Sequence, residues 1–430
     1  MNEYFLHFIW KNRLMHLQGL TATSGETIEI VHQGYHNLHA GPDFTEAKIK
    51  INNTLWVGNV EIHVQASDWE KHSHHTNEQY NNVILHVVKN ADKQAFRKNG
   101  SEIPTLVLQF DPEMFHIYNQ LSKYKNPKVC SNHIHMLDSL VIPLWIDRLS
   151  VERLQLKSEE IITTLKQYNN NWEQVFYIFV ARAFGFNVNA QPFEMIAKLI
   201  SVTQLARQKD NLLQTEALLF GVAGFLDEPD GDNYYLQLKA EYRHLQAKYG
   251  LKSIPVSTWK FLRLRPYNFP TIRIAQFAAL VHKSVSLFSK VVEAKTIDDL
   301  TLLFTVSASD YWDMHYQFNI ISKKQVKNFG NDAVNLLLIN VAAVFLFTYG
   351  QVKQNDDYKE FSLYLLENTN SEKNAIVDKW TNSGLKIENA RQSQALLQLD
   401  KHYCREQRCL DCQIGTKLLL SKHLKNLLLS

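Results

Sequence analysis

The feature that most constrains the fold is a pair of strand-like segments, residues 44–51 and 54–65, separated only by Asn52-Asn53. Two asparagines between alternating apolar and polar segments are typical of the tight turn of a β-hairpin. In a strand, successive side chains point to opposite faces. In the second segment, the side chains expected to point into a core are Trp56, Val60, Ile62 and Val64. Those expected on the opposite face are Asn59, Glu61, His63 and Gln65.

The pattern on either side of this hairpin predicts an α+β chain of more than one domain. A short amphipathic helix is expected over residues 2–13, and a helix over residues 68–81 should be followed by two apolar strands. Farther along, nearly all of the chain has helical spacing, and 430 residues exceed the size of a typical single core. The predicted parts are a mixed-sheet domain at 1–115, a linker at 116–142 and a helical domain at 143–430.

Charge and histidine are unevenly distributed along the chain. The first 115 residues hold 9 Lys or Arg and 13 Asp or Glu, whereas the net charge of the whole chain is +3, so the remainder is basic. Ten of the 18 histidines precede residue 90. This asymmetry suits a metal site joined to a body that binds a polyanion. Chance placement of charges on a solvated surface is the alternative explanation.

The sequence gives no indication of secretion or of a membrane span. The N-terminal residues lack the basic flank, apolar core and cleavage site of a secretory signal. The longest apolar run, residues 333–347, falls short of the roughly 20 residues that cross a bilayer and predicts a buried helix. Four cysteines in a chain of this length do not make a disulfide framework. We therefore expect a cytoplasmic protein with no membrane partner.

Acidic residues and a histidine around the hairpin predict a hydrolytic metal site. Asp43 directly precedes the first strand, and Glu61 and His63 share one face of the second. Two carboxylates can hold Mg²⁺ or Mn²⁺ against a phosphate oxygen and a water, while a third polar group orients or deprotonates that water. We predict Asp43 and Glu61 as metal ligands and all three residues as catalytic. Accessory candidates are Gln65, Asp68, His72 and His75.

This arrangement resembles the PD-(D/E)XK nuclease superfamily, whose restriction-endonuclease-like fold carries an Asp at the start of one strand and Glu-x-Lys on its neighbour. The resemblance covers roughly residues 1–110 and includes the order of helices and strands. It implies a divalent-metal-dependent nuclease that hydrolyses DNA or RNA. One departure is His63, which stands where the superfamily has Lys. A neutral imidazole is no permanent cation, although it can bind a softer metal or relay a proton.

Two alternatives to the nuclease stay open. On the predicted helix, His72 and His75 share a side, and Asp68 and His72 form an i, i+4 pair. Together with His74, these side chains would either add metal ligands or form a solvated face. Added imidazole ligands would suit Mn²⁺ or Zn²⁺, as in a zinc-dependent hydrolase of another class. The other alternative is a non-catalytic scaffold that binds nucleic acid or protein through a degenerate nuclease fold.

A second candidate metal site is the cysteine cluster near the C-terminus. Cys404, Cys409 and Cys412 have C-x₄-C-x₂-C spacing, and the pair separated by two residues is typical of a thiolate metal site. Cys130 or His402 would supply the fourth ligand. The spacing does not distinguish structural Zn²⁺ from an iron–sulfur cluster. Three reduced, partly buried thiols are the alternative.

Cations alternate with aromatic side chains in residues 260–273. This pattern suits contacts to backbone phosphates and stacking on bases, which makes nucleic acid the predicted partner. Arginines at this spacing can equally brace carboxylates between helices. The three predicted contacts are Arg263, Arg265 and Arg273.

Five strings spread over the chain are similar to one uncharacterised bacterial family, found chiefly in Bacteroidota. The similarity covers almost the whole chain and is specific. It implies membership of a family of unknown function and supplies no activity, so the nuclease prediction rests on the residues above. The strings are Gly-Pro-Asp-Phe at 41–44, the Glu-Ile-His segment at 61–74, and the segments 216–226, 261–273 and 403–412.

Overall fold

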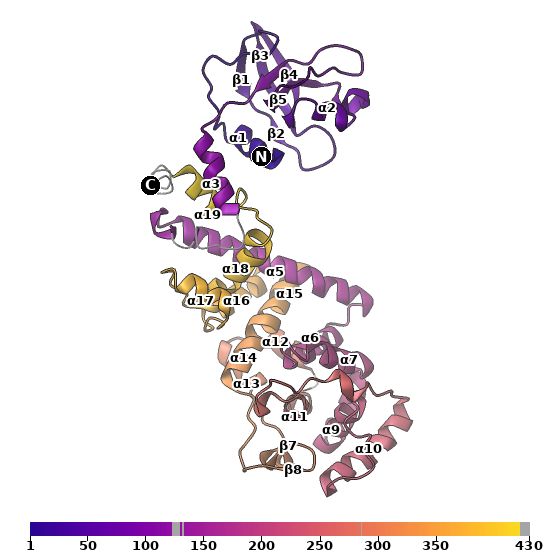
Figure 1. Ribbon diagram of the computed structural model, residues 1–430. Helices are drawn as coiled ribbons and strands as arrows, with labels where there is room; N and C mark the ends of the chain where they lie inside the picture. Colours follow the sequence, from indigo (N-terminus) through magenta and orange to yellow (C-terminus); the bar gives the residue numbers. More distant parts are fainter. Residues whose placement is uncertain (123–129, 131–132, 285, 422–430) are drawn as a thin grey trace. The chain divides into compact units, whose positions relative to one another are not determined.

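The structure is a computed structural model that describes residues 1–122, 130, 133–284 and 286–421 (Figure 1). The chain forms two compact units: one combines Met1–Trp145 with the segment from Asp400 onward, and the other is Ile146–Leu399. The C-terminal segment is therefore part of the first unit, whereas the sequence places it at the end of the helical domain. Of the predicted linker, residues 123–129 and 131–132 lie outside the described residues.

The first unit is built on a six-stranded mixed sheet of order β1-β3-β4-β5-β6, with β2 also paired to β3. Strands β1, β2 and β4 run antiparallel to β3, whereas the β4–β5 and β5–β6 pairs are parallel. The strands are β1 (Ile28–His32), β2 (Tyr35–His36), β3 (Phe44–Ile51), β4 (Thr54–Gln65), β5 (Val83–Asn90) and β6 (Thr105–Val107). The helices are α1 (Glu3–Lys11), α2 (Asp68–Lys71), η1 (His74–Thr76), η2 (Glu78–Tyr80), α3 (Pro112–Ser122), η3 (Ile134–Met136), η8 (Asp400–Cys404) and α19 (Gln413–Leu420).

The β3–β4 hairpin has the bounds that the alternation predicted. Asn52 lies in the turn with φ +52°, a left-handed conformation that asparagine tolerates better than most residues. The prediction of which β4 side chains face the core is only partly correct. Val60 and Ile62 are buried, but the Trp56 side chain is 50% exposed. The four residues nearest the turn on β4 are all exposed, so the tip of the hairpin extends beyond the core.

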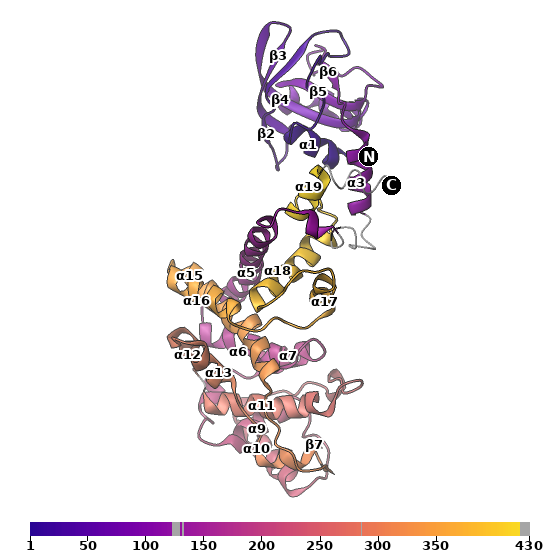
Figure 2. The same ribbon diagram turned by 90° about the vertical axis from the view of Figure 1, so that its left-hand side faces the viewer.

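Helix α1 closes one face of this sheet by packing against β4 (Figure 2). It is amphipathic and buries five apolar side chains. Asn2 caps its first turn by accepting a hydrogen bond from the Phe5 amide at 3.2 Å. The helix therefore holds His7, whose Nε2 is buried, at a fixed place near the start of β3, where it lies 3.2 Å from Asp43.

The second unit is helical apart from a two-stranded ribbon. Its helices are α5 (Val141–Gln167), which begins in the first unit, α6 (Trp172–Phe184), α7 (Ala190–Leu199), α8 (Val202–Ala206), α9 (Leu212–Val222), α10 (Asn233–Tyr249), η4 (Val256–Thr258), η5 (Pro266–Asn268), α11 (Pro270–Lys283), α12 (Leu287–Glu293), α13 (Ile297–Phe304), η6 (Asp310–Met314), α14 (Asn331–Leu337), the π-helical turn η7 (Leu338–Ala342), α15 (Ala343–Lys353), α16 (Asp356–Glu367), α17 (Ala375–Thr381) and α18 (Ala390–Leu399). The ribbon is β7 (His315–Gln317) with β8 (Ile320–Ile321).

The long apolar run of the second unit is a core helix. Elements α14, η7 and α15 form one helix over Asn331–Lys353 that is long and apolar enough to cross a membrane by length and composition alone. However, 78% of its most apolar window is buried inside the protein. The prediction of a buried helix over residues 333–347 is therefore confirmed.

Candidate metal centre

The polar face of β4 is buried. Glu61 is 5% exposed and His63 is 1% exposed, so these two side chains are covered as well as those of Val60 and Ile62 on the opposite face. The parallel register pairs Glu61 with His86 on β5, and the chain that crosses from β4 to β5 covers this face with α2, η1 and η2. A carboxylate and an imidazole buried together need polar partners, and the neighbouring elements supply them.

Asp43 and Glu61 are joined through each other's backbone. The Asp43 amide donates to Glu61 Oε2 at 3.0 Å, and the amide of Ile62 donates to Asp43 Oδ2 at 2.8 Å. His7 Nε2 lies 3.2 Å from the same Asp43 oxygen. Each carboxylate therefore keeps one oxygen that accepts no hydrogen bond from a backbone amide of the described residues, and the structure brings together the two acidic residues that the sequence singled out.

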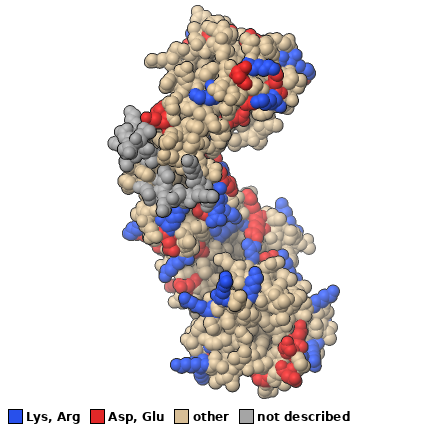
Figure 3. All heavy atoms as spheres, in the orientation of Figure 1, with Lys and Arg blue, Asp and Glu red and all other residues tan. Residues whose placement is uncertain are grey.

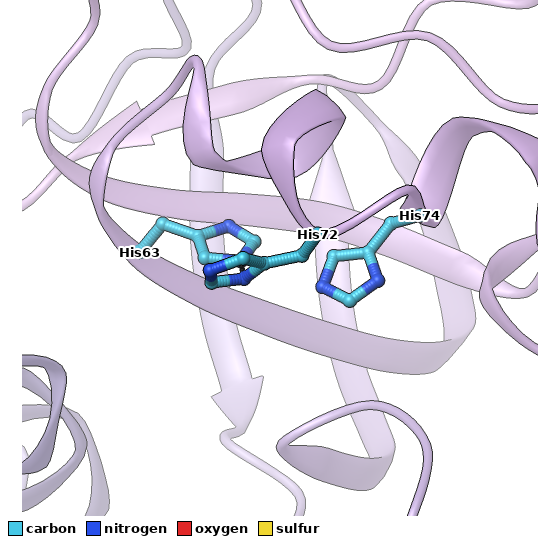
Figure 4. Close-up of side chains that lie close together, drawn as sticks. All are labelled: His63, His72 and His74. Atoms are coloured by element: carbon cyan, nitrogen blue, oxygen red, sulfur yellow. Dashed lines mark hydrogen bonds between the residues drawn. The ribbon is translucent and has the colours of Figure 1, made fainter.

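Three histidines, His63, His72 and His74, lie close together (Figure 4). One ring nitrogen from each of His63, His72 and His74 lies within 4.8 Å of the others, and within the part of the chain that the structure describes this is the one such group of three His, Cys, Asp or Glu side chains. His63 Nε2 is 3.2 Å from His72 Nδ1. His74 Nε2 is 3.1 Å from Glu61 Oε1, and His63 Nε2 is 3.7 Å from the same oxygen.

Burial determines the protonation of this cluster. It lowers the pKa of His63 to about 2, helped by the neighbouring His86, His74 and His72, and it lowers the pKa of His86 to about 4. Burial and the nearby Asp43 carboxylate raise the pKa of Glu61 well above its ordinary range. The imidazoles of His63 and His86 are therefore neutral near pH 7, while Glu61 favours its neutral form when no cation is near.

The residues present fit a transition-metal ion. Two nitrogen ligands 2.0–2.1 Å from a tetrahedral ion lie ~3.4 Å apart, close to the 3.2 Å between the His63 and His72 nitrogens. His63 Nδ1 is 2.8 Å from His86 Nε2, a contact that can fix which nitrogen of His63 faces the cluster. Neutral imidazoles with a carboxylate are ligands typical of Zn²⁺ and Mn²⁺ sites.

The predicted helix over residues 68–81 is wrong, and its break assembles the cluster. Helix α2 ends at Lys71, and Ser73 adopts a left-handed conformation with φ +61° before η1 begins. This turn brings His72 and His74 to the same side, although residues two apart on an α-helix face different ways. Trp69 anchors the segment, since it is fully buried and its Nε1 donates to Phe96 O at 2.9 Å.

The other accessory candidates lie outside the three-histidine group. Asp68 accepts hydrogen bonds from the Gln65 amide at 3.0 Å and from Lys71 Nζ at 2.6 Å, so its carboxylate stabilises the turn after β4. Gln65 contributes this amide, and no contact between its side chain and the cluster is found in the described part of the chain. His75 has one buried ring nitrogen without a hydrogen-bond partner among the described residues.

The sequence pattern does not show that three further histidines lie at or beside the site. His7 was not singled out, because nothing in the α1 pattern shows that its side chain reaches Asp43. His74 was named without being selected, since the spacing on a continuous helix favours His72 and His75. His86 lies mid-strand among apolar residues, a pattern typical of a core histidine, and it is fully buried, yet its ring contacts His63.

The cysteines are not brought together in the same way. Cys409 Sγ donates to the carbonyl of Leu121 at 3.5 Å, and Cys412 is buried. Burial, with a smaller effect from Cys412, raises the pKa of Cys409 to about 12, which keeps this thiol protonated. Among the described residues, no three of Cys130, Cys404, Cys409, Cys412 and His402 form a group within 4.8 Å. Metal binding by the cysteines stays a prediction.

The arginines of the aromatic segment differ in exposure. Arg263 and Arg265 are exposed, but Arg273 is only 8% exposed and lies within the helical unit. A surface contact between Arg273 and a nucleic-acid backbone is therefore not available. On the face seen in Figure 3, Lys and Arg are interspersed with Asp and Glu rather than gathered in one basic patch.

Comparison with known proteins gives a family and no activity. A search of the curated proteins found no match. A search of the solved structures found none either. Residues 3–375 match the family described as "Protein of unknown function (DUF2851)", a match that ends before the C-terminal cysteines. Because the match covers most of the chain, the protein belongs to this family.

Proposed function

We propose that the protein is a divalent-metal-dependent phosphodiesterase that acts on DNA or RNA. The observation that carries the proposal is the joining of Asp43 and Glu61 on a buried sheet face beside the cluster of His63, His72 and His74. Hard oxygen ligands and imidazoles in one place are the ligands of a hydrolytic metal site. The site would lie in the first unit, at the start of β3 and the middle of β4.

The order of elements supports phosphodiester chemistry in particular. The sequence α1, β1, β3, β4, α2, β5 follows the helix, three strands, helix, strand order of the PD-(D/E)XK superfamily, apart from the two-residue strand β2. Asp43 precedes the second of the three strands, and Glu61 lies on the third. This is a likeness in arrangement, so the activity follows from it only as a proposal.

Each residue would have a distinct role. Asp43 and Glu61 would hold the cation through their carboxylates, and His72 and His74 would add imidazole ligands. A bound cation would polarise a phosphate oxygen and make its water acidic. His63, which is neutral, would ligate the cation or orient the attacking water, roles that need neither a permanent positive charge nor uptake of a proton. The contact between His7 and Asp43 would orient that carboxylate.

The imidazoles also indicate which metal the site prefers. Mg²⁺ favours oxygen ligands and retains water, whereas Mn²⁺ and Zn²⁺ accept nitrogen. We therefore propose Mn²⁺ or Zn²⁺ ahead of Mg²⁺. The same cluster supports a zinc-dependent hydrolase of another class as the second candidate. A cytoplasmic location is part of the proposal, in keeping with four cysteines that form no disulfide.

Glu61→Gln tests the proposal. Metal-stripped protein would be incubated with single-stranded DNA, double-stranded DNA and RNA, with Mg²⁺, Mn²⁺ or Zn²⁺ added. We expect Mn²⁺- or Zn²⁺-dependent cleavage that Glu61→Gln lowers by more than the roughly 10–100-fold typical of losing an outer-shell partner. The matched control is Glu29→Gln, on the exposed side of β1, which should cleave normally.

Three outcomes would contradict the proposal in different ways. Undiminished cleavage by a folded Glu61→Gln variant would exclude Glu61 from the site. Nucleic-acid binding with no cleavage and no metal would favour the non-catalytic scaffold. Metal bound by the histidines, together with hydrolysis of simple esters but not of nucleic acid, would favour the zinc hydrolase of another class.

A further inference from the structure

A buried arginine in the helical unit has no acidic partner. Arg273 lies in the first turn of α11, and its two terminal nitrogens donate to amide oxygens, at 2.6 Å to Asn268 Oδ1 and at 3.0 Å to Gln276 Oε1. Its third nitrogen, Nε, is buried without an acceptor among the described residues. No ion pair to Arg273 is found within the part of the chain that the structure describes.

The surroundings of Arg273 compensate its charge only in part. The guanidinium lies 4.6 Å from the centre of the Phe186 ring and 5.1 Å from that of Phe329, distances at which a cation is attracted to an aromatic face. Burial lowers the pKa of Arg273 to about 10, and no carboxylate opposes this effect. Buried charges in proteins are normally paired, so a guanidinium without a carboxylate partner among the described residues is suited to an anionic ligand.

Arg273 lines a small cavity whose walls carry no acidic residue. The cavity has a volume of about 60 Å³, several times the roughly 10–15 Å³ that one water requires, so it holds a group of a few heavy atoms. Pro270, the first residue of α11, also lines it. Pro270 has no N–H, and the Arg273 amide donates to the Phe269 carbonyl at 3.1 Å, so of these two residues only the Arg273 side chain offers donors to the cavity.

We propose that this cavity binds a small oxyanion of the phosphate class, held by the Arg273 guanidinium. Guanidinium nitrogens are donors that recognise phosphate oxygens. The exposed Arg263 and Arg265 flank Leu264, another residue of the cavity wall, and attract anions to its opening. The oxyanion is either free phosphate or the terminal phosphate of a nucleotide.

Calorimetric titration of the full-length protein with inorganic phosphate tests this site, with chloride at equal ionic strength as the reference. We expect saturable binding that Arg273→Lys weakens by roughly tenfold or more, because Lys keeps the charge but lacks the forked donors. The matched control, Arg243→Gln on the exposed side of α10, should bind phosphate like the wild type.

Asn268→Asp is the second variant, and it does not rely on replacing a buried side chain. Asn268 is exposed, and its Oδ1 already touches the guanidinium, so a carboxylate there would occupy the place of the anion. We expect this variant to lose phosphate binding and to have a higher Tm than the wild type in phosphate-free buffer. A variant that binds phosphate as tightly as the wild type would overturn the site.

A nucleoside 5′-monophosphate and the matching nucleoside identify the source of the anion. If the monophosphate binds more tightly than phosphate and the nucleoside does not bind, the site is supported and its ligand is a nucleotide. Tighter binding of free phosphate supports the site and assigns the free ion. If the wild type binds neither phosphate nor the monophosphate saturably, or if the nucleoside binds equally well, the inference is wrong.

Discussion

Burial gives neighbouring residues of β4 opposite shifts in pKa. Glu61 and His63 are two positions apart on the same face, yet the pKa of the carboxyl is raised and the pKa of the imidazole is lowered. Both shifts have one physical cause, which is that a low-dielectric environment disfavours the charged form. The face therefore carries little charge of its own, and a divalent cation would supply the charge that makes Glu61 ionise.

Glu216 on α9, in the second unit, shows the same effect. It is 1% exposed, it accepts hydrogen bonds from Tyr234 Oη and, at 2.8 Å, from Ser309 Oγ, and burial raises its pKa to about 7. A raised carboxyl pKa means that the folded state holds a proton that the unfolded state has released. The stabilisation is complete below the ordinary pKa of about 4.5 and is lost as the pH rises through 7.

We therefore predict that Glu216→Gln flattens the pH dependence of stability. Relative to this variant, the wild type should lose as much as ~3 kcal/mol of unfolding free energy between pH 4.5 and pH 8, at about 1.4 kcal/mol per pH unit. Urea denaturation across this range measures the difference. Glu228→Gln, in an exposed loop, is the control and should follow the wild type. A wild-type-minus-variant difference that does not change with pH would mean that Glu216 stays ionised.

At the scale of elements, local patterns predicted the hairpin but not the segment after it. Residues 44–51 and 54–65 alternate in hydrophobicity and meet at a turn-forming pair, so every local preference agrees with the observed strands. After them, residues 68–81 have helical spacing, but Ser73 takes a left-handed conformation that no spacing rule reveals. The position of His74 depends on that one residue, which explains why the sequence could place Glu61 and His63 on one face but could not place His74 beside them.

The segment with α2 and η1 owes its position to Trp69, which leads to a prediction at this scale. Trp69→Phe removes the donor to the Phe96 carbonyl and leaves space beside His74 and His86, whose ring centres lie 5.3 and 5.4 Å from that of Trp69. We expect the first unit to lose about 1–3 kcal/mol of stability and to bind Mn²⁺ or Zn²⁺ more weakly. Denaturation and metal titration measure the two effects.

Trp56→Phe is the matched control for this prediction. Trp56 is 50% exposed near the tip of the same hairpin, so its replacement should change stability by little and metal affinity not at all. If Trp69→Phe destabilises the protein but binds metal like the wild type, the segment is positioned by contacts other than Trp69.

For the whole molecule, the division into units depends on contacts that a pattern cannot specify. Amphipathic spacing shows that a helix has a buried face, but not which element covers it. The helical spacing continues through α18 into the C-terminal segment, so the sequence predicts one helical domain from residue 143 to the end. In the structure, α19 packs against α3 of the first unit, and the large core of the second unit is drawn entirely from residues 154–390.

A core contained in one stretch of chain predicts that the second unit unfolds independently. Calorimetry of the full-length protein should show two transitions, and the fragment of residues 141–399, which keeps α5 whole, should reproduce one of them. A ligand at 100 times its Kd adds about 2.7 kcal/mol, which raises the Tm of a unit of this size by ~5–10 °C. Metal should shift only the transition that the fragment does not reproduce, because its proposed ligands belong to the first unit. Phosphate should shift only the transition that the fragment reproduces. A single transition that both ligands shift equally would show that the two units unfold as one.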